Sequence, residues 1–470
     1  MEIKNTWKTY SHKQEKAAFA FAEDYKDFLT HAKTERECVD AIVSRIEEAG
    51  YRELEGVIAS NETLKPGDKV YAVQMNKAVV MFHIGKRPLS EGLNILGAHI
   101  DSPRLDIKQN PLYEDGGFAY LDTHYYGGVK KYQWVTIPLA LHGVVVKKDG
   151  MTVEINIGED PDDPVFFVSD LLIHLSQEQL EKKASKVIEG EALDIIIGNK
   201  PLVLSKKNED KDSEAKEAVK AGILDILKSQ YGFEEEDFIS AELEVVPAGA
   251  ARDAGFDRSM ILGYGHDDRV CAFPSMQAML NIGTPQRTSC CLLVDKEEIG
   301  SVGATGMQSK FFENDLAEVM ALTGEDNPRL LRRCLANSFM LSSDVSSAYD
   351  PTYASSFDKK NVAYLGGGMV FNKFTGARGK SGSNDANAEY LGALRALFDK
   401  EGVNFQTAEL GRVDLGGGGT IAYILALYGM NVIDSGIAVL NMHAPWEAIS
   451  KADLYETLRG YEAFLKHMGN

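Results

Sequence analysis

The chain has 470 residues, of which 44% are hydrophobic, and its formal net charge is −20. A chain of this length exceeds one ordinary hydrophobic core, so we expect a globular protein of two domains. The acidic balance argues against nucleic acid and anionic membranes as partners, because both favour clustered lysine and arginine.

The N-terminal segment, residues 1–10, is polar and mixed in charge, without the apolar core of a secretory signal. No apolar run of the chain approaches the about 20 residues that cross a membrane. The five cysteines are odd in number and lack C-x-x-C spacing, as expected of buried thiols in a reducing compartment. These features predict a cytoplasmic protein.

Helices and strands alternate in the first part of the chain. Residues 15–49 are predicted to form two helices, the second of which begins with a capping box at Thr34 and Glu37. Residues 70–83 favour a β-hairpin. Residues 94–100 favour a short, nearly all-apolar strand of the kind that is buried inside a mixed sheet.

This last strand leads into His99 and Asp101, which lie two residues apart and therefore share one face of an extended chain. In such a pair the aspartate holds one ring nitrogen of the histidine while the other nitrogen binds a metal ion. A single histidine in a strand is more often a packed core residue, and these residues alone leave that alternative open.

Residues 105–255 differ from the preceding residues in their pattern of predicted secondary structure. Short β-like runs occur at residues 133–141, 143–146 and 152–157. A heavily charged stretch, residues 206–220, is expected to form a solvated loop and the start of a helix. We predict that the whole region is an inserted, largely β second domain.

Acidic residues recur after the predicted insert, where the alternation of helices and strands resumes. Asp267 and Asp268 stand at the start of a predicted helix, where acidic side chains either complement the helix dipole or bridge two cations. The apolar strand at residues 290–294 then leads to Glu297 and Glu298. Adjacent residues of an extended chain point to opposite faces, so one glutamate can bind a metal while the other faces a water molecule. The alternative is that both belong to a solvated loop.

Two more strands lead to polar residues. Residues 339–341 precede Asp344, and residues 437–440 precede His443. In α/β sheets such strand ends converge on one crevice.

Three loops are predicted in the same region. A strand is expected to end in the glycines 366–368, and a polar loop that contains Lys380 is expected to precede a helix capped near Asn384. The glycines 416–419 precede an apolar helix predicted over residues 421–428. This glycine run is a weak sign of phosphate binding, because the G-x-G-x-x-G fingerprint is absent.

Separate strand and helix ends thus deliver seven candidate residues: His99, Asp101, Asp267, Glu297, Glu298, Asp344 and His443. Histidine and carboxylate ligands suit Zn²⁺, and a bridging aspartate with two further ligands for each ion suits a co-catalytic pair about 3.5–4 Å apart. No cysteine occurs among them, which is typical of a catalytic rather than a structural zinc site.

Five motifs occur in one order along the chain: Gly97–Pro103, Asp267–Arg269, Glu297–Gly300, Asp344 and Met442–His443. In these motifs the chain resembles, over nearly its whole length, the aspartyl aminopeptidase family of dinuclear zinc, tetrahedral-shell aminopeptidases, and in particular a bacterial member. The form Asp268-Arg269 differs from the Asn-Leu of eukaryotic members but is shared with related tetrahedral aminopeptidases.

The resemblance implies an α/β fold in which a mixed-sheet zinc-exopeptidase catalytic domain, residues 1–104 and 256–470, is interrupted by a β-rich dimerisation domain, residues 105–255. It further implies two Zn²⁺ per subunit, with Co²⁺ or Mn²⁺ as substitutes, and self-association to a homododecamer.

The resemblance also assigns metal ligands, residue by residue. Asp267 would bridge the two metals. His99 and Asp344 would complete one site, and Glu298 and His443 the other.

Four further roles follow from the same resemblance. Asp101 would orient His99, and Glu297 would be the general base. His174, which lies in the insert, would reach the active site of a neighbouring subunit and hold the substrate carbonyl; a packed core histidine is the alternative. Lys380 matches a family lysine that meets an acidic substrate side chain.

We therefore expect a metallo-aminopeptidase that releases N-terminal residues, acidic Asp or Glu among them, from peptides. Glu297 would take a proton from water held between two zincs and return it to the leaving amine. Two alternatives stay open: a dinuclear-zinc deacylase or carboxypeptidase of related fold, and an inactive shell-forming protein.

Overall fold

The computed structural model describes residues 4–202 and 217–469. The chain divides into two compact units. Unit 1 comprises residues 1–102, 251–442 and 446–470, and unit 2 comprises residues 103–250 and 443–445.

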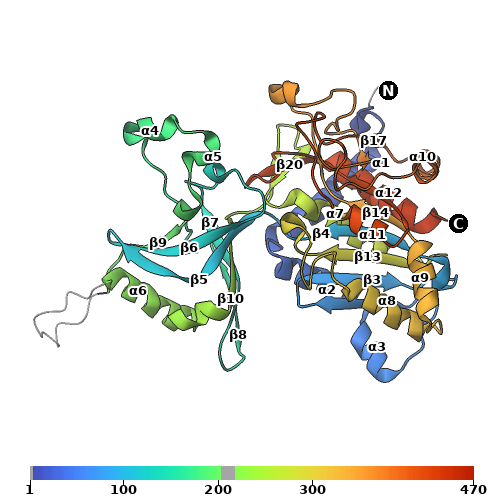
Figure 1. Cartoon of the computed structure of the whole chain (residues 1–470), viewed down its shortest axis with the longest axis horizontal. Coiled ribbons are helices and arrows are strands. Elements are labelled where there is room, and N and C mark those ends of the chain that lie inside the picture. Colours follow the sequence, from blue (N-terminus) through green and yellow to red (C-terminus); the bar gives the residue numbers. More distant parts are fainter. Residues whose placement is uncertain (1–3, 203–216, 470) are drawn as a thin grey trace, which may run out of the picture. The chain divides into compact units, whose positions relative to one another are not determined.

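A mixed sheet forms the centre of unit 1 (Figure 1). Among the described residues its strand order is β1-β2-β3-β13-β4-β14-β18-β16-β17. The strands span Arg52–Glu53 (β1), Lys69–Gln74 (β2), Ala78–His83 (β3), Asn94–His99 (β4), Ser289–Val294 (β13), Phe339–Ser343 (β14), Met369–Asn372 (β16), Phe405–Thr407 (β17) and Asn431–Gly436 (β18). The central strands β13, β4, β14 and β18 are parallel, and β4 and β13 are buried along their whole length. Burial on both faces explains why these two strands read as continuous apolar runs.

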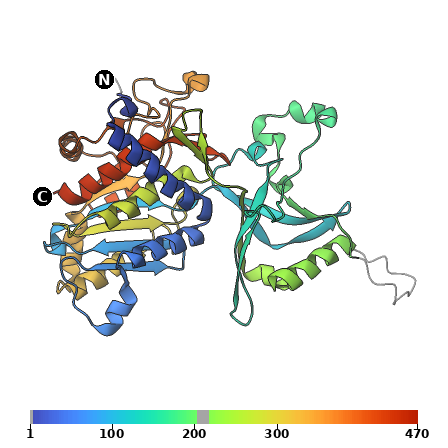
Figure 2. The same cartoon turned by 180° about the vertical axis from the view of Figure 1, so that it is seen from behind.

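Helices cover both faces of this sheet. The first face carries α1 (His12–His31), α2 (Glu35–Glu48), α7 (His266–Asn281), α10 (Ala388–Glu401) and α12 (Lys451–His467). In Figure 2 the blue helices α1 and α2 and the red helix α12 lie over this face. The second face carries α3 (Leu54–Ser60), α8 (Phe311–Leu322), α9 (Pro328–Ala336) and α11 (Ala422–Ala426). No helix in the described part of the chain has both the length and the apolarity needed to cross a membrane.

Unit 1 also contains a smaller sheet, two of whose strands follow central strands of the main sheet along the sequence. Its order among the described residues is β11-β12-β20-β19-β15. The strands span Arg252–Ala254 (β11), Met260–Gly263 (β12), Ser346–Ser347 (β15), Ala438–Leu440 (β19) and Glu447–Ser450 (β20). β15 follows β14 and β19 follows β18 after short links, so the central strands continue into this second sheet.

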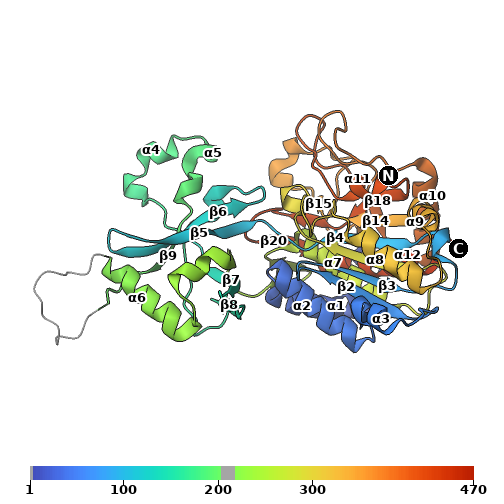
Figure 3. The same cartoon turned by 60° about the horizontal axis from the view of Figure 1, so that its bottom comes forward.

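Unit 2 is built on an antiparallel sheet with the order β8-β7-β10-β5-β6-β9 in the described residues. The strands span Arg104–Asp115 (β5), Phe118–Tyr126 (β6), Leu139–Val146 (β7), Thr152–Ile157 (β8), Ile195–Gly198 (β9) and Ala241–Pro247 (β10). Helix α6 (Ala218–Ile226) packs along β5, β6 and β9 (Figure 3). The short helices α4 (Gln177–Leu180) and α5 (Ala184–Val187) lie in the long connection between β8 and β9.

Several predicted elements are confirmed. The capping box of α2 is present, because the Thr34 hydroxyl accepts from the Glu37 N–H while the Glu37 carboxylate accepts from the Thr34 N–H. The hairpin of β2 and β3 and the buried strand β4 also lie where the sequence predicts them. All five cysteines are free and buried.

Other predicted boundaries are wrong. The strand expected to end in the glycines 366–368 begins after them, because the carboxylate of Asp453 accepts hydrogen bonds from the N–H groups of Gly366 and Gly368 and holds the segment as a turn. α10 is capped by Asn387 rather than near Asn384.

Two further differences concern a helix and the insert. α11 ends at Ala426, earlier than predicted, and the following residues make i→i+3 hydrogen bonds instead. The two β-like runs at residues 133–141 and 143–146 are one strand, β7, which begins only at Leu139. Most of the charged stretch, residues 206–216, lies outside the described residues.

Candidate active site

His99 is the last residue of β4, at the carboxyl end of the parallel strands, and it is 1% exposed. Its Nε2 lies 3.1 Å from Oδ1 of Asp267 and 4.0 Å from Oδ1 of Asp344. Its Nδ1 lies 3.0 Å from the backbone oxygen of Asp101 and 3.3 Å from the Oδ1 of the same residue. His99 is therefore buried against carboxylates rather than against apolar side chains. With Nδ1 donating to Asp101, Nε2 faces the other two aspartates and is the ring nitrogen placed to bind a cation.

Asp101 is fully buried and connects two motifs that are far apart in the sequence. Its Oδ1 accepts a hydrogen bond of 3.1 Å from the N–H of Glu297, and its Oδ2 accepts one of 3.2 Å from the N–H of Glu298. Lys296 has a left-handed backbone, with φ 69°, and the chain then forms a short 3₁₀ turn over Glu297–Ile299. One carboxylate thus positions the histidine and the backbone of both glutamates.

Asp267 stands at the start of α7, where its own φ and ψ are not helical. Ser102 Oγ donates a hydrogen bond of 2.6 Å to the backbone oxygen of Asp267, and Glu447 Oε2 accepts one of 3.0 Å from the Asp267 N–H. The sequence reasoning missed both Ser102 and Glu447 as site residues. The signal that could have found them is their position: Ser102 lies inside the Gly97–Pro103 motif, and Glu447 follows shortly after His443.

The site concentrates negative charge in a buried place. The pKa of Asp344 lies well above its usual range, because burial and the neighbouring charges of Glu297 and Asp267 disfavour another anion. Burial also raises the pKa of Asp268 well above the usual value, and Asp267 adds repulsion. Bound cations would offset this repulsion, so the donor set fits a metal centre.

Two groups of three side chains in the described residues hold their ligand atoms within 4.8 Å of one another. The first group is His99, Asp267 and Asp344, and the second is Asp267, Glu298 and His443. Nitrogen and carboxylate oxygen ligands of this kind suit Zn²⁺. Asp267 is common to both groups, which is the position expected of a bridging ligand. These are the five residues predicted as ligands, and their individual roles stay a prediction.

The ring of His443 is oriented by a backbone carbonyl group of unit 2. Its Nδ1 lies 2.8 Å from the backbone oxygen of Gly128, which can only accept, so Nδ1 is the donor and Nε2 is the nitrogen that could bind a metal ion. A Cβ at position 128 would lie 3.3 Å from this Nδ1, closer than most real contacts of a Cβ atom. The histidine is also in the left-handed region, with φ 64°.

His174 lies in unit 2, in a short 3₁₀ turn of residues Ile173–Leu175. The alternative of a packed core histidine is wrong, because His174 is exposed and the flanking Ile173 and Leu175 are each 68% exposed. Neither ligand group in the described residues includes it.

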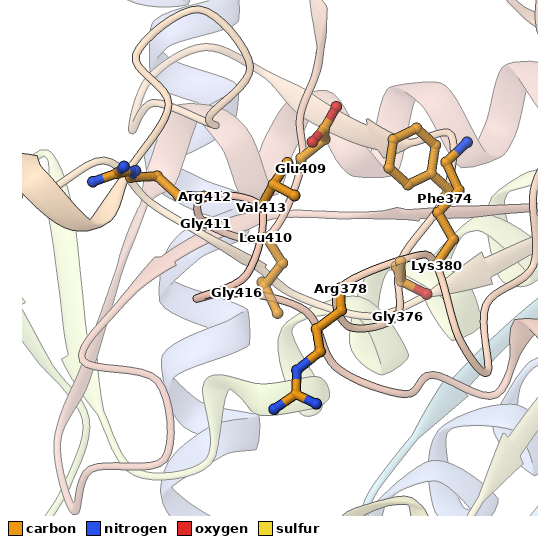
Figure 4. A pocket seen from close by; sticks show the side chains of 11 residues that line it. Phe374, Gly376, Arg378, Lys380, Glu409, Leu410, Gly411, Arg412, Val413 and Gly416 are labelled. Carbon is orange, nitrogen blue, oxygen red and sulfur yellow. The ribbon is translucent and has the colours of Figure 1, made fainter.

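Lys380 lines a pocket of unit 1 together with Phe374, Arg378, Glu409, Arg412 and Gly416, among others (Figure 4). Its Nζ lies 3.0 Å from Oδ2 of Asp385 and 3.7 Å from the centre of the Phe374 ring. The Lys380 side chain is 45% exposed, so it is paired with Asp385 but remains accessible from the solvent.

The chain is similar to known proteins over nearly its whole length. Residues 28–465 match the family described as aminopeptidase I zinc metalloprotease (M18). A probable M18 family aminopeptidase 1 of Clostridium acetobutylicum is 61% identical over 466 residues, which cover 99% of this chain and 98% of that protein. The crystal structure of an M18 aminopeptidase from Thermotoga maritima superposes with a TM-score of 0.92 at 44% identity and covers 99% of both chains.

A more distant structure, the mApe1 dodecamer of S. cerevisiae, shares the fold with a TM-score of 0.75 at 20% identity, over 95% of this chain and 96% of that one. The predicted α/β architecture is confirmed by these superpositions. The sequence match spans nearly the whole chain and includes every motif of the candidate site. The chain therefore belongs to the M18 family and is a metallo-aminopeptidase.

Proposed function

We propose that this enzyme removes N-terminal residues from peptides with two zinc ions, and that it prefers acidic residues at the cleaved end. His99, Asp267 and Asp344 would hold one ion, and Asp267, Glu298 and His443 the other. The observation that carries this proposal is the Asp101 carboxylate, which accepts from the N–H groups of both Glu297 and Glu298. It fixes a prospective ligand and a prospective base side by side, next to a buried histidine.

Zinc bound in such a site supplies a Lewis acid for the scissile carbonyl and lowers the pKa of water. Glu297 then takes the proton of the attacking water and delivers it to the nitrogen of the leaving amine. Glu297 occurs in neither ligand group of the described residues, which favours a role in proton transfer over one in metal binding. Asp101 keeps the glutamate backbone in place throughout the cycle.

The preference for acidic residues rests on the charge of the Lys380 pocket. Lys380, Arg378 and Arg412 contribute three cations to its lining, against the single carboxylate of Glu409. A carboxylate of the substrate would gain a charge-assisted hydrogen bond there, which contributes about 1.5–3 kcal/mol. Asp385 now pairs with Lys380 and would compete with the substrate for it.

Self-association to a homododecamer is part of the same proposal, with the unit 2 insert as the element that mediates dimerisation. The insert exposes an apolar segment whose members include Leu172, Ile173 and Leu175, 53%, 68% and 68% exposed. A segment of this kind is typical of a surface that another protein chain covers. His174 lies within it and would act on the substrate of a neighbouring subunit. We further propose that the enzyme works in the cytoplasm.

A panel of aminoacyl-naphthylamides with N-terminal Asp, Glu, Lys and Leu tests the proposed function. We expect turnover of the acidic substrates that disappears with a chelator and returns with Zn²⁺, Co²⁺ or Mn²⁺. Acetylated versions of the same substrates should not be hydrolysed. Release of acetate from the acetylated substrates would favour a deacylase instead, and the absence of turnover with every metal would favour an inactive shell protein.

A further inference from the structure

Asp434 is a buried acid that the reaction described above does not use. It lies on β18, where it is paired in register with Ser342 of β14, and it is fully buried. Its Oδ1 accepts a hydrogen bond from the hydroxyl of Thr420, while its Oδ2 has no hydrogen-bond partner among the described residues. Burial raises the pKa of Asp434 to about 7. Burial of a carboxyl group costs free energy, so a structural or functional role is expected for Asp434.

Thr420 ends the glycine run 416–419 and joins it to α11. Its Oγ1 donates to Asp434 and also lies 3.4 Å from the N–H of Ala422, in the first turn of that helix. A chain of four consecutive glycines has little conformational preference of its own, so ordering it is entropically costly. Thr420 therefore connects a flexible segment to the rigid central sheet.

The glycine run is in close contact with the loop that carries Lys380. The N–H of Gly376 donates a hydrogen bond of 2.8 Å to the backbone oxygen of Gly418. A Cβ at Gly417 would lie only 2.0 Å from the backbone oxygen of Gly376. Only glycine permits this approach, and the position of one segment consequently determines the position of the other.

Strand β18 also makes a hydrogen bond to the loop that carries Lys380. Asn384 Nδ2 donates a hydrogen bond of 2.7 Å to the backbone oxygen of Val432, two residues before Asp434. Within the loop, the N–H of Thr375 donates a hydrogen bond of 2.8 Å to Ser383 Oγ. Both walls of the pocket in Figure 4 are thus attached to β18 by side-chain hydrogen bonds.

We propose that Thr420 and Asp434 are positioning residues, which hold the glycine run against the Lys380 loop and thereby set how tightly the pocket grips the side chain of the substrate. This inference rests on the proposed function, since it takes the pocket to be the one for the N-terminal residue. The order of the two loops, however, is measurable without any substrate.

The test compares Thr420→Val, which removes the hydroxyl at nearly constant volume, with Thr420→Ser, which keeps it. Hydrogen exchange is measured by mass spectrometry on the zinc-loaded enzyme, in peptides that cover residues 374–385 and 411–420. We expect faster exchange in both segments for Thr420→Val and exchange like that of the wild type for Thr420→Ser. Thr420→Ala repeats the test without the methyl groups that valine must bury.

Kinetics give the second readout. For acidic naphthylamides, Thr420→Val should raise KM by about tenfold, the loss expected for one hydrogen bond, and should lower kcat much less. Thr420→Ser should restore KM, and the zinc content should not change.

Unchanged exchange in both Thr420→Val and Thr420→Ala would overturn the positioning role, whatever the enzyme hydrolyses. Faster exchange with an unchanged KM would overturn the link to substrate grip. If the wild type does not prefer acidic substrates, the proposed specificity fails, but the exchange result still decides whether Thr420 holds the loops.

Discussion

At the scale of single residues, the proposed function gives two different tasks to the acidic pair after β13, Glu297 and Glu298. Asp101 holds the backbone of Glu297 and Glu298 equally, while only Glu298 joins a ligand group in the described residues. Substitution of Glu297 should therefore affect proton transfer without removing a ligand.

We predict that Glu297→Gln keeps both metal equivalents and the melting temperature but lowers kcat by about 10²- to 10⁴-fold, the usual contribution of a general base. Metal analysis and turnover of one sample measure both effects. Glu298→Gln is the matched control and should lose metal. If Glu297→Gln loses a metal equivalent while Glu298→Gln keeps it, the two roles are exchanged.

The second prediction at this scale concerns Lys380. Lys380→Met keeps most of the side-chain length and removes the charge, so kcat/KM for Asp and Glu substrates should fall about 10- to 100-fold. Leu substrates should be nearly unaffected. Lys310→Met is the matched control, because it removes a 67% exposed lysine that does not line this pocket, and it should leave kcat/KM unchanged. An equal loss on all substrates would show that Lys380 shapes the loop rather than selects the substrate.

At the scale of elements, α10 depends on its first residue. The Asn387 side chain accepts a hydrogen bond of 2.8 Å from the N–H of Tyr390 and donates one of 2.6 Å to Asn431. We predict that Asn387→Ala destabilises the first turn of α10 by about 1 kcal/mol, the usual value of an N-cap, and that Asn387→Ser recovers most of it. Hydrogen exchange in residues 388–391 measures the change. Equal protection in all three proteins would mean that packing alone holds the helix start.

A second element-scale prediction concerns β3, which ends in His83. Burial, with the nearby charge of Lys69, lowers the pKa of this histidine to about 4, compared with about 6.5 in an unfolded chain. Between these values the unfolded chain binds the extra proton, so the free energy of unfolding falls as the pH drops from about 6.5 to about 4.

His83→Gln removes that contribution, and its melting temperature relative to the wild type should rise as the pH is lowered through this window. His12→Gln is the matched control, because the side chain of His12 is 94% exposed. A difference between His83→Gln and wild type that is constant from pH 7 to pH 4.5 would contradict the prediction.

The same scale shows what the sequence could reveal about fold and site. His99 and Glu297 were predictable because one apolar strand ends at His99 and another ends shortly before Glu297, and strand ends converge in a parallel sheet. The hydrogen bond between Thr420 and Asp434 was not predictable, because a single acidic residue inside an apolar strand forms no sequence pattern that points to its partner. The turn at the glycines 366–368 was missed for a similar reason, because Asp453 reaches it from a distant helix.

At the scale of the whole molecule, the prediction is that activity requires assembly. His174 and its exposed apolar neighbours would be completed by another copy of the chain. Shells of His174→Ala and shells of Glu297→Gln should each be inactive, and subunit exchange between them should restore part of the activity. Glu297→Gln mixed with Glu298→Gln is the control, because both defects then lie in the same unit. Verified exchange without recovery would count against a shared site.

The hydrogen bond between His443 and Gly128 has a consequence for engineering. Residues 443–445 are counted with unit 2, although the chain on either side of them belongs to unit 1. Excision of residues 103–250 with a short linker would leave the strands of the main sheet intact, yet it would remove the carbonyl that fixes the tautomer of His443. Such a minimised enzyme would lack the contact that orients His443 in the proposed second metal site, so we expect the insert not to be a removable accessory.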